Sequence, residues 1–286
     1  IAVVAGERLF IVDAGTNGAR NLMLMGYPIG QIEALFLTHY HSDHIDGLGE
    51  MATLRWVSNA NKKPLPVFGP EGLEDVVNGF NLAYSADFLH RHTHHGDDVA
   101  PMSGKGMIAK PFVTPPNNEL MQLFLEEDLV IEAIRVDHGV VSPAVGYRFT
   151  YKDRSLVISG DTKQSDNILR FARGTDLLIH EALAPNLVGL MNSAAKKLNL
   201  PIPAKITTDI LDYHASPIEA AETARDANVG HLLFYHIVPP LILPGQEALF
   251  LNGAEDIFSE LTVGRDGTSF SMPSGSNEII LKRTGL

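Results

Sequence analysis

The sequence predicts an α/β fold, and three features support this prediction. Short apolar runs of strand length recur along the 286 residues, and segments with the cap residues of helices lie between them. Several of the apolar runs carry acidic or histidine residues at their ends. A composition of 45% hydrophobic and 20% charged residues provides for a substantial buried core. Because no long linker or internal repeat divides the chain, we expect a single domain over residues 1–286.

The strands are expected in eight apolar segments that have the length and residue types of buried strands. These segments are residues 8–15, 32–39, 64–70, 129–139, 144–149, 155–162, 176–183 and 231–239. Residues 145–160 predict a hairpin, because the turn sequence YKDRS separates two alternating runs. In an α/β scaffold, strands that end in polar side chains deliver those side chains to a functional site.

The clearest helix signal is the segment SPIEAAETARDANVG, residues 216–230. Ser216 is an N-cap residue, Pro217 occupies the first helical position, and Glu219 completes a capping box. A second helix is expected over residues 46–58. By contrast, residues 80–128 contain polar and turn-forming stretches, which predict an irregular lid or insertion.

The composition excludes several classes of site and partner. The formal net charge of -12 disfavours extended binding to a polyanion, so we expect nucleic acid to be an unlikely partner. The chain has no cysteine, which excludes disulfides and thiolate ligands, so any metal must be held by His, Asp or Glu. No apolar run approaches the roughly 20 residues of a membrane span, so no membrane partner is expected. The chain begins at Ile1 in a strand-like run, and we expect an upstream segment to have been removed, which leaves a cytoplasmic, periplasmic or secreted location open.

The strongest functional signal is the pattern H-x-H-x-D-H at the end of a predicted strand, formed by His39, His41, Asp43 and His44. On an extended strand end His39 and His41 point the same way, and the following turn directs Asp43 and His44 to a second point nearby. This geometry suits two metal ions better than one. The alternative is a polar turn that happens to contain histidines, but four ligand types at this spacing favour metal binding.

Two metal ions need more ligands than this motif supplies, and three candidates follow downstream. His138, Asp161 and His236 each come after a strand-like apolar run and before turn-forming residues. Each of them alone is a weak signal. Together with the first motif they form a set of seven.

This set of residues resembles the ligand signature of the metallo-β-lactamase superfamily, T-H-x-H-x-D-H followed by a His, an Asp and a His. The resemblance extends from Asp13 to His236 and implies a four-layer αββα sandwich. It also implies that Asp13 supports a ligand imidazole and that the ions are two divalent metals, with zinc favoured. In that arrangement the first ion is held by His39, His41 and His138, the second by Asp43, His44 and His236, and Asp161 bridges the two.

Two further motifs resemble the RNase Z and arylsulfatase branches of the superfamily. HEAL, residues 180–183, is similar to the H-E-A-T motif of RNase Z, and YHASPIEAAETA is similar to its H-S-T motif. This resemblance makes Glu181 and His214 a candidate acid pair. The structural alternative is a strand carboxylate and a histidine that is hydrogen-bonded to backbone beside the helix.

These observations predict a dinuclear metal-dependent hydrolase with Asp43, Glu181 and His214 as catalytic residues. We expect it to cleave a phosphodiester, sulfate ester or related ester with a metal-bridging hydroxide, on a small-molecule substrate, with a homodimer allowed. A tRNA 3′-processing endonuclease of the RNase Z type is an alternative. It is disfavoured because the predicted hairpin fills the stretch between His138 and Asp161, where RNase Z carries a tRNA-gripping arm. A β-lactam hydrolase, an iron redox enzyme and a non-catalytic binding module are further alternatives.

The histidine-rich stretch of His90, His92, His94 and His95 is a candidate for a second metal site. Because no paired spacing on a predictable helix or strand connects these residues, the sequence favours a polar loop near the pocket.

Overall fold

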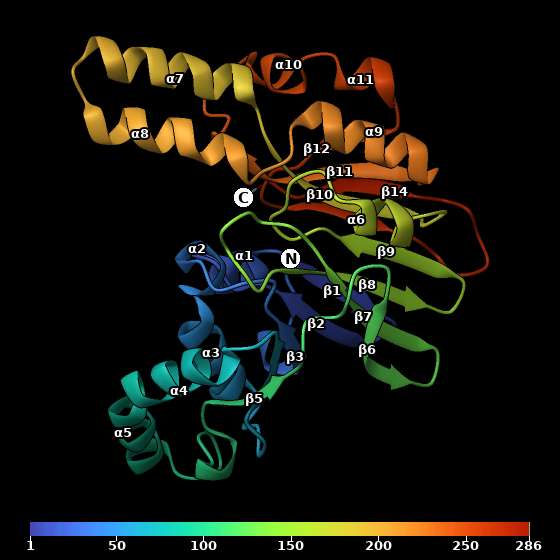
Figure 1. Ribbon diagram of the computed structural model, residues 1–286. Helices are drawn as coiled ribbons and strands as arrows, with labels where there is room; N and C mark the ends of the chain where they lie inside the picture. The colour runs from blue at the N-terminus through green and yellow to red at the C-terminus, as the bar shows by residue number, and fades with distance from the viewer. Residues whose placement is uncertain (286) are drawn as a thin grey trace. The chain divides into compact units, whose positions relative to one another are not determined.

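The computed structural model describes residues 1–285 and confirms the predicted α/β class, with mixed sheets and helices (Figure 1). The chain forms two compact units, one of residues 1–113 with the C-terminal residues from Thr284, the other of residues 114–283. The single domain over residues 1–286 stays a prediction.

The first unit contains a five-stranded sheet in the order β1-β2-β3-β4-β5. β1 and β2 are antiparallel, and β2 to β5 are parallel to one another. Apart from Glu33, the side chains of β3 are apolar and buried, among them Ile32, Leu35 and Phe36, as expected of a strand in a parallel sheet. The strands are β1 (Ala2–Ala5), β2 (Arg8–Val12), β3 (Ile32–Phe36), β4 (Leu65–Gly69) and β5 (Met107–Pro111). The helices are α1 (Gly18–Leu24), η1 (Ile29–Gln31), α2 (Ser42–Ile45), α3 (Leu48–Ser58), α4 (Leu73–Ala83), α5 (Ser85–His95) and η2 (Met102–Gly104).

The structure differs from the expectation of an irregular segment over residues 80–128. Helix α5 lies within this range, as do β5 and part of α4. The helix α5 is stabilised by tertiary contacts on one face: the Phe88 ring packs edge-on against Trp56 with centroids 5.6 Å apart, and His92 Nδ1 lies 3.0 Å from the Ala100 carbonyl oxygen. Because α5 has so few apolar residues, its sequence pattern alone did not indicate a helix.

The second unit contains a seven-stranded sheet in the order β12-β11-β10-β9-β8-β7-β6 and a small two-stranded sheet of β13 and β14. β6 to β9 form an antiparallel meander, and β9 to β12 are parallel. The strands are β6 (Leu120–Glu126), β7 (Leu129–Arg135), β8 (Val145–Tyr151), β9 (Arg154–Ile158), β10 (Leu177–Leu183), β11 (His231–Val238), β12 (Leu261–Val263), β13 (Thr268–Ser271) and β14 (Ile280–Arg283). The helices are α6 (Asp166–Phe171), α7 (Pro185–Lys197), α8 (Pro201–Asp209), η3 (Ile210–Asp212), α9 (Pro217–Ala227), α10 (Gln246–Leu251) and α11 (Ala254–Ile257). The predicted hairpin is confirmed as β8 and β9.

Both predicted helices are confirmed. Helix α3 occupies most of residues 46–58, and α9 begins with the expected capping box, in which Glu219 N–H donates to Ser216 Oγ and Ser216 N–H donates to Glu219 Oε2. Helix α9 packs a row of buried alanines, including Ala220 and Ala224, in the same cluster as Leu178 of β10 and Leu232 of β11. These small residues let the helix lie close to the parallel strands that carry Glu181 and His236.

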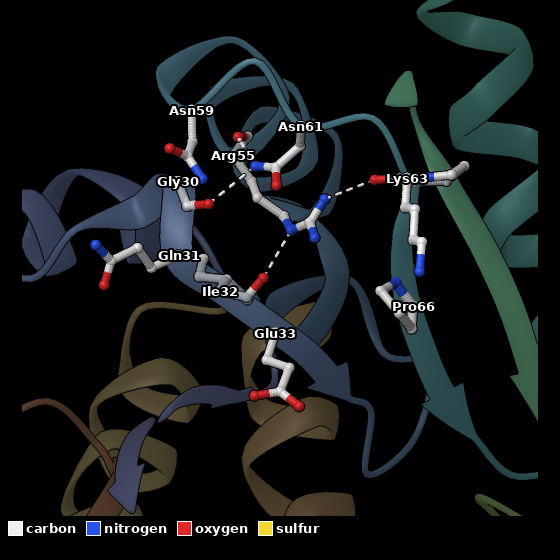
Figure 2. A pocket seen from close by; sticks show the side chains of 10 residues that line it. Gly30, Gln31, Ile32, Glu33, Arg55, Asn59, Asn61, Lys63 and Pro66 are labelled. Atoms are coloured by element: carbon white, nitrogen blue, oxygen red, sulfur yellow. Dashed lines mark hydrogen bonds between the residues drawn. The ribbon is translucent and has the colours of Figure 1, made fainter. Parts of the chain in front are cut away.

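A surface pocket in the first unit surrounds Arg55, as Figure 2 shows. Arg55 is 8% exposed, and its guanidinium donates from Nε to the Ile32 carbonyl at 2.7 Å and from Nη1 to the Lys63 carbonyl at 2.9 Å. These two bonds join α3 to the start of β3 and to the segment before β4. The lining residues are Gly30, Gln31, Ile32, Glu33, Arg55, Asn59, Asn61, Lys63, Pro64 and Pro66, so none of the seven predicted ligands lines the pocket.

We expect Arg55→Ala to lower the free energy of unfolding by about 2–4 kcal/mol, because two carbonyls lose their side-chain donor at a buried position. Urea unfolding monitored by far-UV circular dichroism measures this effect. Lys63→Ala is the matched control, since Lys63 contributes only its backbone carbonyl and its side chain is exposed. Equal free energies of unfolding for Arg55→Ala and Lys63→Ala would show that the two Arg55 hydrogen bonds do not stabilise the fold.

Candidate metal centre

The four predicted ligands of the first motif lie in the turn between β3 and the end of α2. His39 and His44 are buried, whereas His41 and Asp43 are exposed. His39 Nε2 lies 3.0 Å from His41 Nδ1, and His44 Nε2 lies 3.7 Å from the Asp43 carboxylate. Two nitrogen ligands of one tetrahedral zinc ion lie roughly 3.3 Å apart, given Zn–N bonds of about 2.0–2.1 Å. The two pairs expected from the sequence, His39 with His41 and Asp43 with His44, are therefore both present.

Asp13, at the end of β2, contacts both ends of the ligand-bearing turn through its carboxylate. Its Oδ2 lies 2.8 Å from His44 Nδ1 and accepts from Thr38 Oγ1 at 2.9 Å, and its Oδ1 accepts from Thr38 N–H at 2.8 Å. Burial would raise the pKa of Asp13, but His44 and the hydrogen bonds outweigh burial and lower it, so the carboxylate stays ionised. With Nδ1 held by Asp13, Nε2 is the atom that His44 can offer to a metal ion.

We expect Asp13→Asn to weaken metal binding by about 10- to 100-fold while all the ligands themselves stay in place, because the His44 ring loses its charged partner. Competition with a chromogenic chelator measures the affinity. Asp46→Asn is the control, since Asp46 directly follows α2 and is exposed. Unchanged affinity in Asp13→Asn would show that the Asp13 carboxylate does not tune the ligand.

A close backbone contact fixes the position of this turn relative to β2. Ala14 N–H donates to the His44 carbonyl at 2.8 Å, and Gly47 N–H donates to the Ala14 carbonyl at 2.7 Å. A Cβ atom at Gly15 would lie 2.2 Å from the Asp43 carbonyl oxygen. Only glycine allows this approach, so the VDAG sequence of residues 12–15 is part of the support for the ligands.

The second unit brings its three predicted ligands together around Asp161. Asp161 is 2% exposed and follows β9. Its Oδ2 lies 3.9 Å from His138 Nε2, and its Oδ1 lies 3.4 Å from His236 Nδ1. His138 Nδ1 lies 2.8 Å from the Tyr213 carbonyl oxygen, so Nε2 is the atom that His138 can offer to a metal ion. Each carboxylate oxygen thus faces a different histidine, as a bridging ligand requires.

His236 owes its orientation to a β-bulge in β11. The pairing of β10 with β11 shifts after Glu181, which pairs with Tyr235, so that Ala182 pairs with Ile237 and His236 is the extra residue. The backbone of His236 has φ 44°, in the left-handed region that is unfavourable for a residue with a side chain. Bulges of this kind redirect a side chain at a functional site. The sequence placed His236 at a strand end, whereas the structure places it within the strand.

Glu181 and His214 form the predicted pair. Glu181, fully buried in β10, accepts three contacts at Oε1: from Thr162 N–H at 3.0 Å, from Ala215 N–H at 3.2 Å, and from His214 Nδ1 at 3.0 Å. Burial and then the charge of Asp161 raise the pKa of Glu181. One ligand atom each of His138, Asp161 and His214 lie within 4.8 Å of one another, and the same holds for Glu181, His214 and His236. His214 therefore lies directly beside the second ligand cluster.

Three supporting groups were not found by sequence analysis. They are the Tyr213 carbonyl, which orients His138, the Thr162 N–H, which contacts Glu181, and Ser159 Oγ, which accepts from the Glu181 N–H at 3.1 Å. Two of them are backbone groups, for which no side-chain pattern exists. Ser159 lies in the predicted strand segment of residues 155–162, so its hydroxyl was the one side-chain signal available for these three groups.

Both clusters fit divalent metal ions by the chemistry of their donors. They consist of imidazole nitrogens and carboxylate oxygens. In His44, His39 and His138 the Nδ1 atom contacts a carboxylate, a hydroxyl and a carbonyl group respectively, the usual environment of metal-binding histidines. The histidines of α5 belong to neither cluster. In residues 1–285 no helix is long and apolar enough to cross a bilayer. The homodimer stays a prediction.

Comparison with known proteins identifies the family. The family model of the metallo-β-lactamase superfamily matches residues 1–226. The chain is 34% identical to Ribonuclease Z of Mycolicibacterium gilvum over 252 residues, covering 86% of this chain and 79% of that protein. It is also 34% identical to Ribonuclease Z of Mycobacterium bovis over 272 residues, covering 92% and 88%.

Solved structures show the same fold. The crystal structure of the metallo-β-lactamase fold protein YhfI from Bacillus subtilis matches with a TM-score of 0.62 at 19% identity, covering 93% of this chain and 88% of that chain. Human tRNase Z, short form, matches with a TM-score of 0.61 at 21% identity, covering 82% and 84%.

These relatives correct one expectation. The sequence predicted a small-molecule ester substrate with nucleic acid as an unlikely partner, but the curated relatives at 34% identity are named as ribonucleases. The prediction was wrong because it relied on net charge, which reflects the whole surface, whereas substrate binding depends on the groups near the site. On the family match, the chain belongs to the metallo-β-lactamase superfamily and is a metal-dependent hydrolase.

Proposed function

We propose that this protein is an endonuclease of the RNase Z type, which hydrolyses a phosphodiester at the 3′ side of tRNA precursors. The observation that carries the proposal is the contact between the buried Glu181 and the partly buried His214 beside the Asp161 cluster, in a chain similar to Ribonuclease Z over most of its length. A simple metal centre has no need of such a pair. A reaction with a poorly departing alkoxide does need an acid, and the ribose oxygen of RNA is such a leaving group.

The proposal assigns two divalent ions, with zinc favoured, to the seven predicted ligands. His39, His41 and His138 are the proposed ligands of one ion and Asp43, His44 and His236 those of the other, with Asp161 as the bridge. When bound, two such ions activate a water for attack and neutralise charge on the phosphoryl oxygens. Family membership and the separate contacts within each cluster support this assignment.

The proposed roles of the protein groups follow from their hydrogen bonds. His214 Nδ1 contacts Glu181 Oε1, so Nε2 is the atom that can carry a proton to the departing ribose oxygen. Glu181 is held by two backbone N–H groups and therefore fixes the imidazole without moving itself. We assign the exposed Asp43 carboxylate the uptake of the proton released by the attacking water, in addition to its role as a ligand.

This protein must bind RNA differently from an enzyme that carries an arm between the ligand His and the bridging Asp. Between His138 and Asp161 the structure contains the β8–β9 hairpin, whose strands are joined by Lys152 and Asp153. With a net charge of -12, favourable long-range attraction to RNA is weak. We therefore expect cleavage with a high KM that depends only weakly on salt concentration, because few phosphate charges are neutralised by the protein.

The test is cleavage of a tRNA precursor with a short 3′ extension at low salt, using protein loaded with Zn²⁺ or Mn²⁺. We expect one cut at the 3′ end of the tRNA, with mature tRNA and a DNA strand of the same sequence left intact. p-Nitrophenyl sulfate and a chromogenic cephalosporin serve as competing substrates. Rapid turnover of either, with the precursor left uncut by the same metal-loaded preparation, would overturn the proposal.

A further inference from the structure

Helix α5 carries four histidines that belong to neither ligand cluster. With eleven residues it is among the longer helices of the first unit, and it contacts α4, which in turn contacts β4 and β5 (Figure 1). The sequence favoured a loop here because no helical spacing was evident. Because the segment is a helix, the spacing of its histidines determines which of them lie on the same face.

The inner face of α5 is defined by Phe88 and His92. Phe88 is 5% exposed and packs with Trp56 and Ala100, and His92 Nδ1 contacts the Ala100 carbonyl oxygen. His90 and His94 each lie two residues further on, a rotation of about 200° around the helix axis, so they lie on the opposite face. Both side chains are exposed.

His90 and His94 are four residues apart, so their Cβ atoms lie about 5–6 Å apart on one face of the helix. Two histidines at this spacing on a helix can bind one metal ion together, as in helical zinc motifs. Within residues 1–285 neither His90 nor His94 forms a hydrogen bond or an ion pair, so their ring nitrogens are available to a ligand. The nearby acid Asp87 is already paired with Arg91, with 2.7 Å between Arg91 Nε and Asp87 Oδ2.

We propose that His90 and His94 form a peripheral site for one borderline transition-metal ion, such as Zn²⁺, Ni²⁺ or Cu²⁺, separate from the predicted dinuclear centre. Imidazole suits these ions and suits Mg²⁺ or Ca²⁺ poorly. In the described chain, no group of three ligand atoms within 4.8 Å includes either histidine. Water therefore completes the coordination, and the ion exchanges readily with solution.

His95 provides the matched control for this pair. It is exposed like His94, and the two rings are in edge contact with centroids 4.6 Å apart, but His95 lies five residues from His90 and so on a different face. A generic effect of histidine content would appear in His95→Gln as well. A bidentate site requires His90 and His94 and does not require His95.

The experiment is a calorimetric titration of the full chain without an affinity tag, first saturated with Zn²⁺ at its tighter sites, then titrated with Ni²⁺. We expect one weaker binding event that falls in affinity by about 10²-fold in His90→Gln and in His94→Gln, because each variant loses the second point of attachment. His95→Gln should retain it. Circular dichroism confirms that α5 is still formed, so loss of the helix is not mistaken for loss of a ligand.

Three results would overturn the proposal. They are absence of the weaker event in the native chain, its full retention in His90→Gln, and an equal loss in His95→Gln. The same variants are assayed for RNA cleavage, where we expect no change, because α5 carries none of the proposed catalytic residues. Failure of RNA cleavage in the native chain would bear on the proposed function alone and leave the Ni²⁺ titration as it stands.

Discussion

Asp161→Ala should lose about 10³-fold or more in turnover and retain at most one tightly bound metal ion per chain. The two carboxylate oxygens of Asp161 face different histidines, His138 Nε2 at 3.9 Å and His236 Nδ1 at 3.4 Å, so one substitution removes a contact from both sides of the cluster. Loss of a single transition-state donor costs about 10²–10³-fold, and here both metal binding and charge stabilisation are affected. Elemental analysis after gel filtration gives the metal content, and precursor cleavage gives the rate.

The fold should survive this substitution. The core strands beside Asp161 are held by buried apolar residues such as Val157, Ile158 and Leu178, and the metal-free chain loses only a buried charge. Asp166→Ala is the control, since Asp166 is exposed in the first turn of α6 and close in sequence. Two metal ions per chain with normal turnover in Asp161→Ala would show that the carboxylate does not bridge.

The features that could be predicted from the sequence are those formed by residues that are neighbours in the chain. The H-x-H-x-D-H turn after β3 could be predicted because its ligands are adjacent in the chain, and the capping box of α9 because Ser216, Pro217 and Glu219 are local. Asp161 could be predicted for a similar reason, because it is a polar residue directly after an apolar strand. In each case short-range rules determine the structure.

The sequence was least informative where tertiary contacts decide. Helix α5 exists because Phe88 and His92 contact Trp56 and Ala100, residues that lie outside any local pattern. The bulge at His236 depends on the register between β10 and β11, which one strand alone does not encode. The Tyr213 carbonyl that orients His138 lies far along the chain, so only the folded structure reveals it.

The substrate class could not be predicted from the sequence for a different reason. Net charge and the length between His138 and Asp161 are properties of the sequence, but neither describes the groups that would contact an RNA. The Glu181–His214 pair is more informative, because it defines what kind of leaving group the site can serve. A test of that pair therefore bears directly on the substrate.

His214→Ala should lower the rate of RNA cleavage by about 10²- to 10⁴-fold and leave hydrolysis of bis(p-nitrophenyl) phosphate near normal. The ribose oxygen needs a proton as it departs, whereas p-nitrophenolate leaves readily as an anion. Metal content should stay unchanged, because His214 is not among the seven proposed ligands. Glu181→Gln should show a weaker form of the same pattern, since it keeps a hydrogen-bonding partner for His214 Nδ1 but removes the charge.

A structural role for His214 predicts a different result. His214 lies two residues before the capped start of α9, and its ring is in edge contact with His138, with centroids 5.1 Å apart. If it only anchors this region, both substrates should lose activity in equal proportion and thermal stability should fall with them. Tyr213→Phe is the control, because the Tyr213 carbonyl that contacts His138 is retained. Equal losses at full stability would instead indicate that His214 contacts the phosphate directly, and the assignment as general acid would then be withdrawn.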